Sequence, residues 1–430
     1  MTDYWCEHAW LPDGVADDVR LSVSEGVLVS VTKDAPRTGT ILEGLVVPGF
    51  ANGHSHAFHR ALRGRTHHER GTFWTWRERM YALAAKLDPD SYYRLARGVY
   101  AEMVLAGYTS VGEFHYVHHT PDGTPYADPN EMSHALVRAA DEAGIRLTVL
   151  DACYLTGGFG RELDDVQRRF ADADAEAWAA RVESFTPEGA RVGAAVHSVR
   201  AVPFDQLAVV AEWAGPLHVH LSEQQAENAE CLRRHGRTPA ALLDDAGVLG
   251  PRTVAVHATH LTPDDVRLLA RTGTRVCFCP TTERDLGDGI GPARVLADEG
   301  VGLCLGSDSH AVIDAFEEAR ALELDDRLAA EERGRFAVPE LLTTATEHDA
   351  IGWGEAGRIA PGAAADLVVV DLGSVRTAGT EPAGALFAAT AADVTDVLIG
   401  GRWVVRDRAH QLIETPEALL GKEIEALWRS

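Results

Sequence analysis

The feature that most constrains the fold is a pattern repeated between about residues 45 and 310. A short apolar run, rich in β-branched residues, is followed each time by a longer stretch with helical periodicity. The eight runs are almost continuously apolar, as strands of a parallel sheet are when both faces are buried. Strands that alternate with helices in this way favour a (β/α)8 barrel. We therefore predict an α/β fold with a TIM-like barrel, whose strands lie at residues 45–50, 109–114, 146–154, 191–199, 217–223, 253–259, 275–280 and 302–308.

Residue types at the predicted helix ends agree with this division. Asp88 followed by Pro89 has the form of an N-cap and a first helical position. Thr262 followed by Pro263 repeats this form, and Gly273 then provides a C-terminal stop. These signals separate helices from the apolar runs on both sides of them.

The two ends of the chain have a different pattern. Residues 1–48 and 360–408 carry short alternating runs, such as VLVSVT and ADLVVVDL, which are broken by glycine and proline and are typical of antiparallel strands. We predict a small β-sandwich domain formed by both termini, a barrel domain over residues 49–359 and a helical tail over residues 409–430. A chain of 430 residues has room for a barrel of about 250 residues or more and a smaller domain.

The charge balance restricts the class of partner. The chain has 40 lysine and arginine residues against 65 aspartate and glutamate residues, a formal net charge of −25. Because nucleic-acid binding requires a basic surface, we expect no nucleic-acid partner. The N-terminal segment MTDYWCEHAW is polar and no run of about 18 apolar residues occurs, so we expect no export signal, no membrane span and a cytoplasmic location. An anionic substrate would need a local cluster of arginines.

The six cysteines are scattered, and most lie in apolar runs where a buried, reduced thiol is expected. Cys277 and Cys279 form a CxC pair. A metal-binding role for this pair has little support, because no second cysteine pair accompanies it.

Reactive side chains gather where the predicted barrel strands end, which is where barrel enzymes carry their catalytic groups. His54 and His56 point to the same side of one strand and can share an ion. His220 and Asp308 would approach from across the barrel mouth. Three imidazole nitrogens and a carboxylate suit one Zn²⁺ ion, with Fe²⁺ as a further possibility, and leave an open position for water.

His218 lies on the same strand face as His220, so one of the two is expected to be a packed histidine. We favour His220 as the ligand because Glu223 follows it three positions later, beyond the strand end.

The segments PGFANGHSH, HVHLSE, VHATH and LGSDSH, in this order, resemble the amidohydrolase superfamily of metal-dependent hydrolases. Within it, HSHAFHRAL, GTFWTWRERMY and AGYTSVGEFHYVHH are similar to the formimidoylglutamate deiminase family of histidine degradation. The resemblance covers nearly the whole chain. It implies a homodimeric hydrolase of C–N bonds that converts a small dianionic amidine, N-formimidoyl-L-glutamate, to N-formyl-L-glutamate and ammonia.

The resemblance also implies roles for particular residues of this chain. Its metal ligands would be His54, His56, His220 and Asp308, its catalytic partners Glu223, His257 and Asp308, and its substrate-binding residues Arg77, Tyr116, His197, Arg200 and His59. Two positions depart from the family pattern, which usually has amide side chains where this chain has His59 and His310; we expect both near the barrel mouth. Binuclear relatives use a modified lysine on the fourth strand. No lysine occurs between Lys86 and Lys422, which favours a single metal ion.

The implied reaction is attack of water on the amidine carbon. A bound Zn²⁺ lowers the pKa of water to about 7, and Asp308 accepts the proton. Glu223 protonates or holds the imino nitrogen, and His257 stabilises the attacking oxygen. Arg77 and Arg200 would each match a substrate carboxylate with paired hydrogen bonds, and Tyr116 would add a hydroxyl.

Alternatives remain open at this point. Arg77 has stacking among neighbouring aromatic side chains as a rival role, and Arg200 a structural salt bridge. A deaminase of an aminated heterocycle, of the guanine or triazine type, would use the same metal site but would need aromatic stacking and amides. A catalytically silent relative that serves as an assembly subunit typically loses metal ligands, whereas this chain keeps all four.

Overall fold

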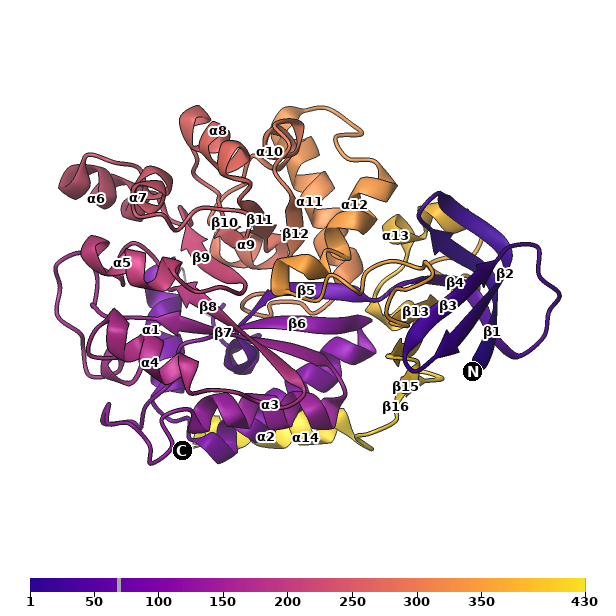
Figure 1. Ribbon diagram of the computed structural model, residues 1–430, viewed down its shortest axis with the longest axis horizontal. Helices are drawn as coiled ribbons and strands as arrows, with labels where there is room; N and C mark the ends of the chain where they lie inside the picture. The colour runs from indigo at the N-terminus through magenta and orange to yellow at the C-terminus, as the bar shows by residue number, and fades with distance from the viewer. Residues whose placement is uncertain (68–70, 430) are drawn as a thin grey trace.

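Two sheets organise the protein, which the computed structural model describes over residues 1–67 and 71–429. The larger unit is the predicted barrel, in which eight parallel strands carry helices on the outside (Figure 1). A bridge between Ser55 and Asp308 brings its two end strands together. In sheet order the strands are β12 (Leu303–Leu305), β11 (Arg275–Phe278), β10 (Thr253–His257), β9 (Leu217–Leu221), β8 (Ala190–Val196), β7 (Arg146–Cys153), β6 (Tyr108–His115) and β5 (Phe50–Ser55).

Helices follow most barrel strands, as the sequence pattern predicted. Asp88 caps α2 by accepting a hydrogen bond from the Ser91 backbone, and Thr262 caps α8. Gly273 ends α8 with a left-handed backbone (φ 71°). The helices are α1 (Phe73–Ala84), α2 (Pro89–Leu105), α3 (Glu131–Ala143), α4 (Ala175–Glu183), α5 (Phe204–Ala211), α6 (Gln225–His235), α7 (Pro239–Asp245), α8 (Pro263–Thr272), α9 (Pro280–Leu286), α10 (Ala293–Asp298), α11 (Ala315–Ala330), α12 (Val338–Ala345), α13 (Ala385–Ala388) and α14 (Pro416–Arg429), with 3₁₀ turns η1 (Ala57–Leu62), η2 (Gln167–Arg169), η3 (His348–Ile351), η4 (Pro382–Gly384) and η5 (Ala391–Asp393).

Strands from both termini form the second sheet, which lies beside the barrel at the right of Figure 1. Its neighbouring strands pair antiparallel, except that β1 and β4 are parallel. In sheet order they are β16 (Ala409–His410), β15 (Arg402–Arg406), β14 (Val394–Ile399), β13 (Leu367–Val370), β4 (Thr40–Pro48), β1 (Thr2–Leu11), β2 (Gly14–Ser24) and β3 (Val27–Thr32).

The predicted first barrel strand, residues 45–50, is wrong in its position. The structure divides this apolar run between β4 of the terminal sheet and β5 of the barrel. The division falls at Gly49, where an added Cβ would lie 2.2 Å from the Thr109 hydroxyl oxygen. Both strands are buried, so the run is apolar throughout and its pattern does not mark the division. The other seven predicted strands overlap β6 to β12.

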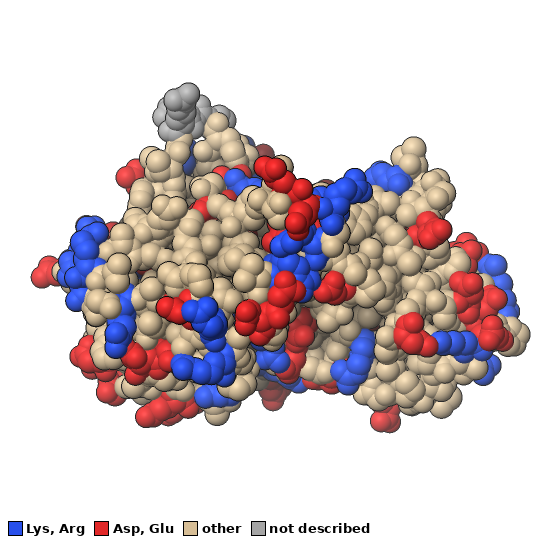
Figure 2. Space-filling model, turned by 90° about the horizontal axis from the view of Figure 1, so that it is seen from above, with Lys and Arg blue, Asp and Glu red and all other residues tan. Residues whose placement is uncertain are grey.

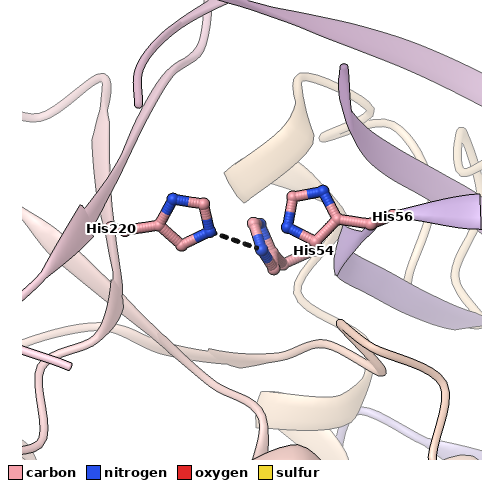
Figure 3. A group of neighbouring side chains, drawn as sticks. All are labelled: His54, His56 and His220. Carbon is pink, nitrogen blue, oxygen red and sulfur yellow. Dashed lines mark hydrogen bonds between the residues drawn. The ribbon is translucent and has the colours of Figure 1, made fainter. Parts of the chain in front are cut away.

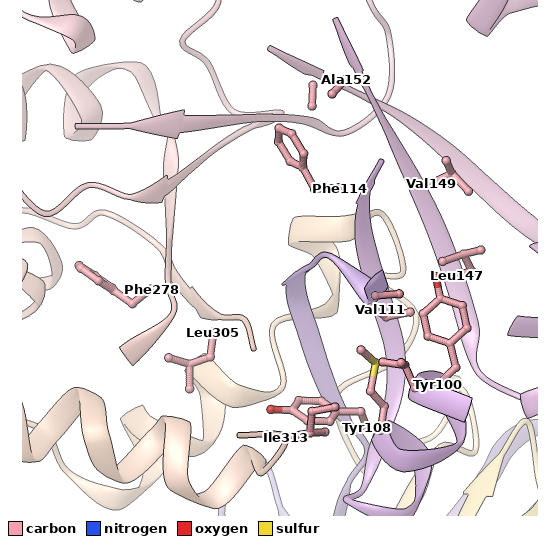
Figure 4. Packing of buried hydrophobic residues seen from close by; sticks show 14 of the residues in the cluster. Tyr100, Tyr108, Val111, Phe114, Leu147, Val149, Ala152, Phe278, Leu305 and Ile313 are labelled. Carbon is pink, nitrogen blue, oxygen red and sulfur yellow. The ribbon is translucent and has the colours of Figure 1, made fainter. Parts of the chain in front are cut away.

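The two faces of a barrel strand contact different parts of the molecule. Val111 and Leu147 are buried with Tyr100 of α2 in the core between barrel and helices, part of which is drawn in Figure 4. Phe114, three positions after Val111, points to the opposite side of β6. Its ring centroid lies 5.1 Å from that of His54. The alternation of the strand thus places one face in the core and the other at the barrel mouth.

On the face shown in Figure 2, arginine and lysine side chains lie beside aspartate and glutamate side chains in several separate places. One exposed group of this kind joins Arg284 to Glu317 and Asp325. Exposed pairs contribute about 0–1 kcal/mol each, so this surface adds little to stability. Among the described residues, no helix combines the length and the apolar character that crossing a bilayer requires.

Candidate active site

A pocket lies at the carboxyl ends of the barrel strands. Histidines, carboxylates and arginines share it with a wall of aromatic side chains. The lining residues are His56, His59, Phe73, Trp76, Arg77, Met80, Tyr81, Tyr116, Tyr154, Phe170, His197, Arg200, His220, Glu223, His257, Leu286 and Asp308.

Three histidines from two strands meet at the floor of this pocket. His54 lies in β5, His56 is the first residue after the end of β5, and His220 lies in β9 (Figure 3). The Nε2 atoms of His54 and His220 are 3.2 Å apart. The ligand atoms of all three lie within 4.8 Å of one another. We call this group the three-histidine set.

Asp308 completes the group from the end of β12. Its backbone N–H donates to the His54 carbonyl (3.0 Å), and its carbonyl accepts from the His56 N–H (3.1 Å). Asp308 Oδ1 lies 3.4 Å from the Nε2 atom of His54 and 3.4 Å from that of His56. The backbone hydrogen bonds that close the barrel therefore also position the Asp308 carboxylate next to His54 and His56.

The hydrogen bonds of the three-histidine set fit a bound cation. His56 Nδ1 donates to the Phe114 carbonyl (2.8 Å), and His220 Nδ1 donates to the His197 carbonyl (2.8 Å). Carbonyls only accept, so the Nε2 atoms of these two rings carry lone pairs that face the floor of the pocket.

Electrostatics supports the same conclusion. Burial, and then the neighbouring imidazoles, hold the pKa of His54, His56 and His220 well below the usual value. Neutral imidazoles beside the Asp308 carboxylate place several lone pairs together with little positive charge between them. A divalent cation bound by these residues relieves that repulsion, and the donor types match Zn²⁺.

Several strand ends around the pocket have a left-handed backbone in residues other than glycine. Ser222 (φ 52°) follows β9, His257 (φ 70°) ends β10, and Asp308 (φ 43°) follows β12. Conformations of this kind cost about 1–3 kcal/mol each and persist where the surrounding structure holds them. Their concentration beside one pocket is typical of a functional site.

Glu223 and His257 lie next to Asp308. His257 Nε2 is 3.7 Å from Asp308 Oδ2 and 3.9 Å from Glu223 Oε1. Burial raises the pKa of Glu223, which favours a proton on this carboxyl. Burial lowers the pKa of His257, but the carboxylates of Glu223, Glu283 and Asp308 outweigh it and raise the pKa. The two side chains therefore have the protonation behaviour of an acid–base pair.

Glu283 is a site residue that sequence reasoning missed. Its Oε1 atom accepts a hydrogen bond from the Cys279 backbone (2.9 Å) and lies 3.2 Å from His257 Nδ1. It stands in the first turn of α9, where no sequence motif distinguishes it from a capping carboxylate. Tyr81 and Tyr154 were also missed as pocket residues.

Two arginines supply positive charge at the outer part of the pocket. Arg200 pairs through Nε with Glu227, and among the described residues its two terminal nitrogens have no hydrogen-bond partner. Arg77 donates to the Tyr81 hydroxyl (2.8 Å from Nε) and lies 4.7 Å from the centroid of that ring. Arg200 thus forms its rival salt bridge, and Arg77 its rival stacking contact. Both arginines nevertheless also line the pocket.

Three further histidines that the sequence analysis singled out lie in different places: one lines the pocket, and two are buried outside its lining. His59 lines the pocket, and its Nε2 atom is 2.9 Å from the Tyr116 hydroxyl. His310 is fully buried outside the pocket lining, and its ring contacts the hydroxyls of Ser307 (2.9 Å) and of Ser55 (3.2 Å). His218 is also fully buried, with Nε2 at 3.0 Å from the Ala350 carbonyl, away from the three-histidine set.

The comparisons with known proteins agree with this geometry. Residues 45–404 match the Amidohydrolase family. The formimidoylglutamate deiminase of Pseudomonas aeruginosa is 40% identical over 95% of this chain and 96% of its own length. The crystal structure of an amidohydrolase from Brucella melitensis superimposes with a TM-score of 0.90 at 33% identity and covers 100% of both chains. An adenosine deaminase from Xanthomonas campestris with bound zinc has a TM-score of 0.85 at 23% identity, over 100% of this chain and 98% of its own, which shows a shared fold.

Proposed function

The chain belongs to the amidohydrolase family, and we propose that it hydrolyses N-formimidoyl-L-glutamate to N-formyl-L-glutamate and ammonia. One observation carries this proposal: a single pocket is lined by Asp308 and by two members of the three-histidine set, His56 and His220, and also by Arg77 and Arg200. His54, the third member, is buried against His220 and Asp308. The histidines and Asp308 fit a metal-dependent attack on an amidine, and the two arginines fit a substrate with two carboxylates. The 40% identity to the Pseudomonas aeruginosa formimidoylglutamate deiminase supports the same substrate.

We propose that His54, His56, His220 and Asp308 hold one Zn²⁺ ion per subunit. The zinc in the Xanthomonas campestris adenosine deaminase and the donor types support this choice. A bound divalent cation would lower the pKa of water to about 7 and so supply a nucleophile at neutral pH. The carbonyls of Phe114 and His197 fix the ring orientations on which this ligand set depends.

The acid–base steps fall to groups of the chain that surround the reacting carbon. Asp308 would accept the proton of the attacking water, because it lines the pocket and its Oδ2 atom lies 3.7 Å from His257 Nε2. Glu223, whose pKa burial raises, would donate a proton to the imino nitrogen so that ammonia can leave. His257, held at Nδ1 by Glu283, would stabilise charge on the attacking oxygen.

Binding of the glutamate part would use the outer arginines. The terminal nitrogens of Arg200, which have no hydrogen-bond partner in the part of the chain that the structure describes, would form paired hydrogen bonds with one carboxylate. Arg77, fixed against Tyr81, would meet the other carboxylate. Tyr116 and His59, which are hydrogen-bonded to each other, would border the amidine end.

A heterocycle deaminase is the second candidate, because Phe73, Trp76 and Phe170 in the pocket lining offer surfaces for stacking. The test measures ammonia release by the metal-loaded protein from N-formimidoyl-L-glutamate and, in parallel, from guanine. Release from the amidine alone supports the proposal, and release from guanine alone refutes it. The family resemblance also leads us to propose a cytoplasmic homodimer, which a molar-mass measurement and cell fractionation would test.

A further inference from the structure

A second group of metal-binding side chains lies beside the three-histidine set. The ligand atoms of His257, Cys279 and Asp308 lie within 4.8 Å of one another, and all three side chains are buried. We call this group the cysteine set. We propose that the cysteine set is a second cation site, selective for a thiophilic divalent ion such as Zn²⁺, and that its occupation inhibits the enzyme.

The Asp308 carboxylate faces both groups. Its Oδ1 atom lies 3.4 Å from the Nε2 atoms of His54 and of His56. Its Oδ2 atom lies 3.7 Å from His257 Nε2, on the other side of the carboxylate. One oxygen is thus available to each cation, so a bridging carboxylate can serve both sites at once.

The Glu283 carboxylate contacts both residues that provide the nitrogen and sulfur donors. Glu283 Oε1 accepts from the Cys279 backbone (2.9 Å) and lies 3.2 Å from His257 Nδ1. This contact uses the Nδ1 side of His257 and leaves Nε2 directed toward Asp308. Glu223 Oε1 lies 3.9 Å from His257 Nε2, beside the cysteine set.

The donors of the cysteine set are one imidazole nitrogen, one sulfur and one carboxylate oxygen, and water can complete a fourth position. Zn²⁺ takes such mixed sets in tetrahedral geometry, whereas Mg²⁺ prefers oxygen ligands alone. Binding would displace the proton of the Cys279 thiol and the proton on His257 Nε2, both of which leave to solvent, and no oxidant or reductant is involved. Cys277, Cys279 and Cys304 all border one apolar cluster with Val254 and Val256, but of the three only the Cys279 sulfur lies within 4.8 Å of the ligand atoms of His257 and Asp308 in such a group.

Inhibition follows from the groups that a second ion would use. It would occupy His257 Nε2 and hold Asp308 Oδ2, next to Glu223. Under the proposed function these are the atoms that stabilise the attacking oxygen and move protons. The inhibitory effect therefore rests on the proposed function, whereas the existence of the site does not.

The test separates binding from activity. Protein that holds one equivalent of Zn²⁺ is titrated with further Zn²⁺, and bound metal is counted after gel filtration. The wild type and the control Cys304→Ser should take up a second equivalent, whereas Cys279→Ser should bind it about tenfold or more weakly. Co²⁺ added as the second equivalent should give a near-ultraviolet thiolate-to-cobalt absorption band in the wild type and in Cys304→Ser but not in Cys279→Ser.

Ammonia release is followed in the same titration, relative to the activity of each protein before excess Zn²⁺ is added. Excess Zn²⁺, but not Mg²⁺, should inhibit the wild type, and Cys279→Ser should need about tenfold more Zn²⁺ for the same inhibition. Unchanged melting temperature and retention of the first equivalent show that the variants are folded. Wild type that stays at one equivalent, or a second equivalent that binds equally well to Cys279→Ser, would overturn the site. A second equivalent with the cobalt band but no inhibition would overturn the inhibitory role alone.

Discussion

Arg181 is a buried cation on which the attachment of α4 to the barrel depends. Its terminal nitrogens donate to both oxygens of Asp151 in β7 (2.8 and 2.9 Å) and to Asp172 (2.9 Å). The side chains of Arg181, Asp151 and Asp172 are 4%, 0% and 7% exposed. Replacement by methionine keeps most of the volume but leaves two buried carboxylates without their cation. We predict that Arg181→Met lowers the free energy of unfolding by about 3–5 kcal/mol at pH 8.

The pH dependence of this loss has a defined sign. In the wild type, burial raises the pKa of Asp172, but hydrogen bonds from His119 and Arg181 outweigh it and hold the pKa below its usual value. Asp172 therefore stabilises the wild type above about pH 4, and this contribution is lost as the pH falls through the folded-state pKa. Without the guanidinium, burial would raise the carboxyl pKa above its unfolded value, so the variant loses stability as the pH rises. The difference between the two proteins should be largest at pH 8 and smaller at pH 5.

Urea unfolding followed by tryptophan fluorescence at pH 8 and pH 5 measures both quantities. Arg168→Met, at an arginine whose side chain is 59% exposed, is the control and should change stability by less than about 0.5 kcal/mol. Adding Asp151→Asn to Arg181→Met should restore part of the loss, because one uncompensated charge is removed. A loss below about 1 kcal/mol, or one that is equal at the two pH values, would refute this account of the buried cluster.

Three further predictions concern the pocket. His220→Ala should weaken metal binding by about tenfold or more, measured as metal retained after dialysis against a chelator; full retention would contradict its assignment as a ligand. Glu223→Gln should lower kcat by about 10²–10⁴-fold with unchanged metal content, whereas unchanged kcat would exclude proton transfer by Glu223. Arg200→Met should raise KM for N-formimidoyl-L-glutamate about tenfold or more, since it removes a charged hydrogen bond worth about 1.5–3 kcal/mol, while Arg233→Met, at a 64% exposed arginine, should not. Unchanged kinetics in Arg200→Met would make Arg200 structural.

Local patterns in the sequence determined much of the fold. Seven of the eight predicted barrel strands overlap observed strands, and the caps at Asp88 and Thr262 form as expected. These features depend on periodicity and on hydrogen bonds between residues a few positions apart, which the residue order contains directly. The pair His54 and His56 was also accessible, because strand alternation places both on one side.

Only the tertiary structure decided which distant groups meet. The apolar run before His54 divides between two sheets because Gly49 packs closely against Thr109, a contact across 60 positions of the chain. Glu283 and Cys279 reach His257 from the following strand and helix, although neither belongs to a motif with it. Periodicity fixes which way a side chain points along its own element, but distances between elements depend on how the whole barrel closes and packs. The candidate metal ligands could therefore be named from the sequence. The contact of Glu283 with His257, and the approach of the second Asp308 oxygen to His257, could not be predicted from it.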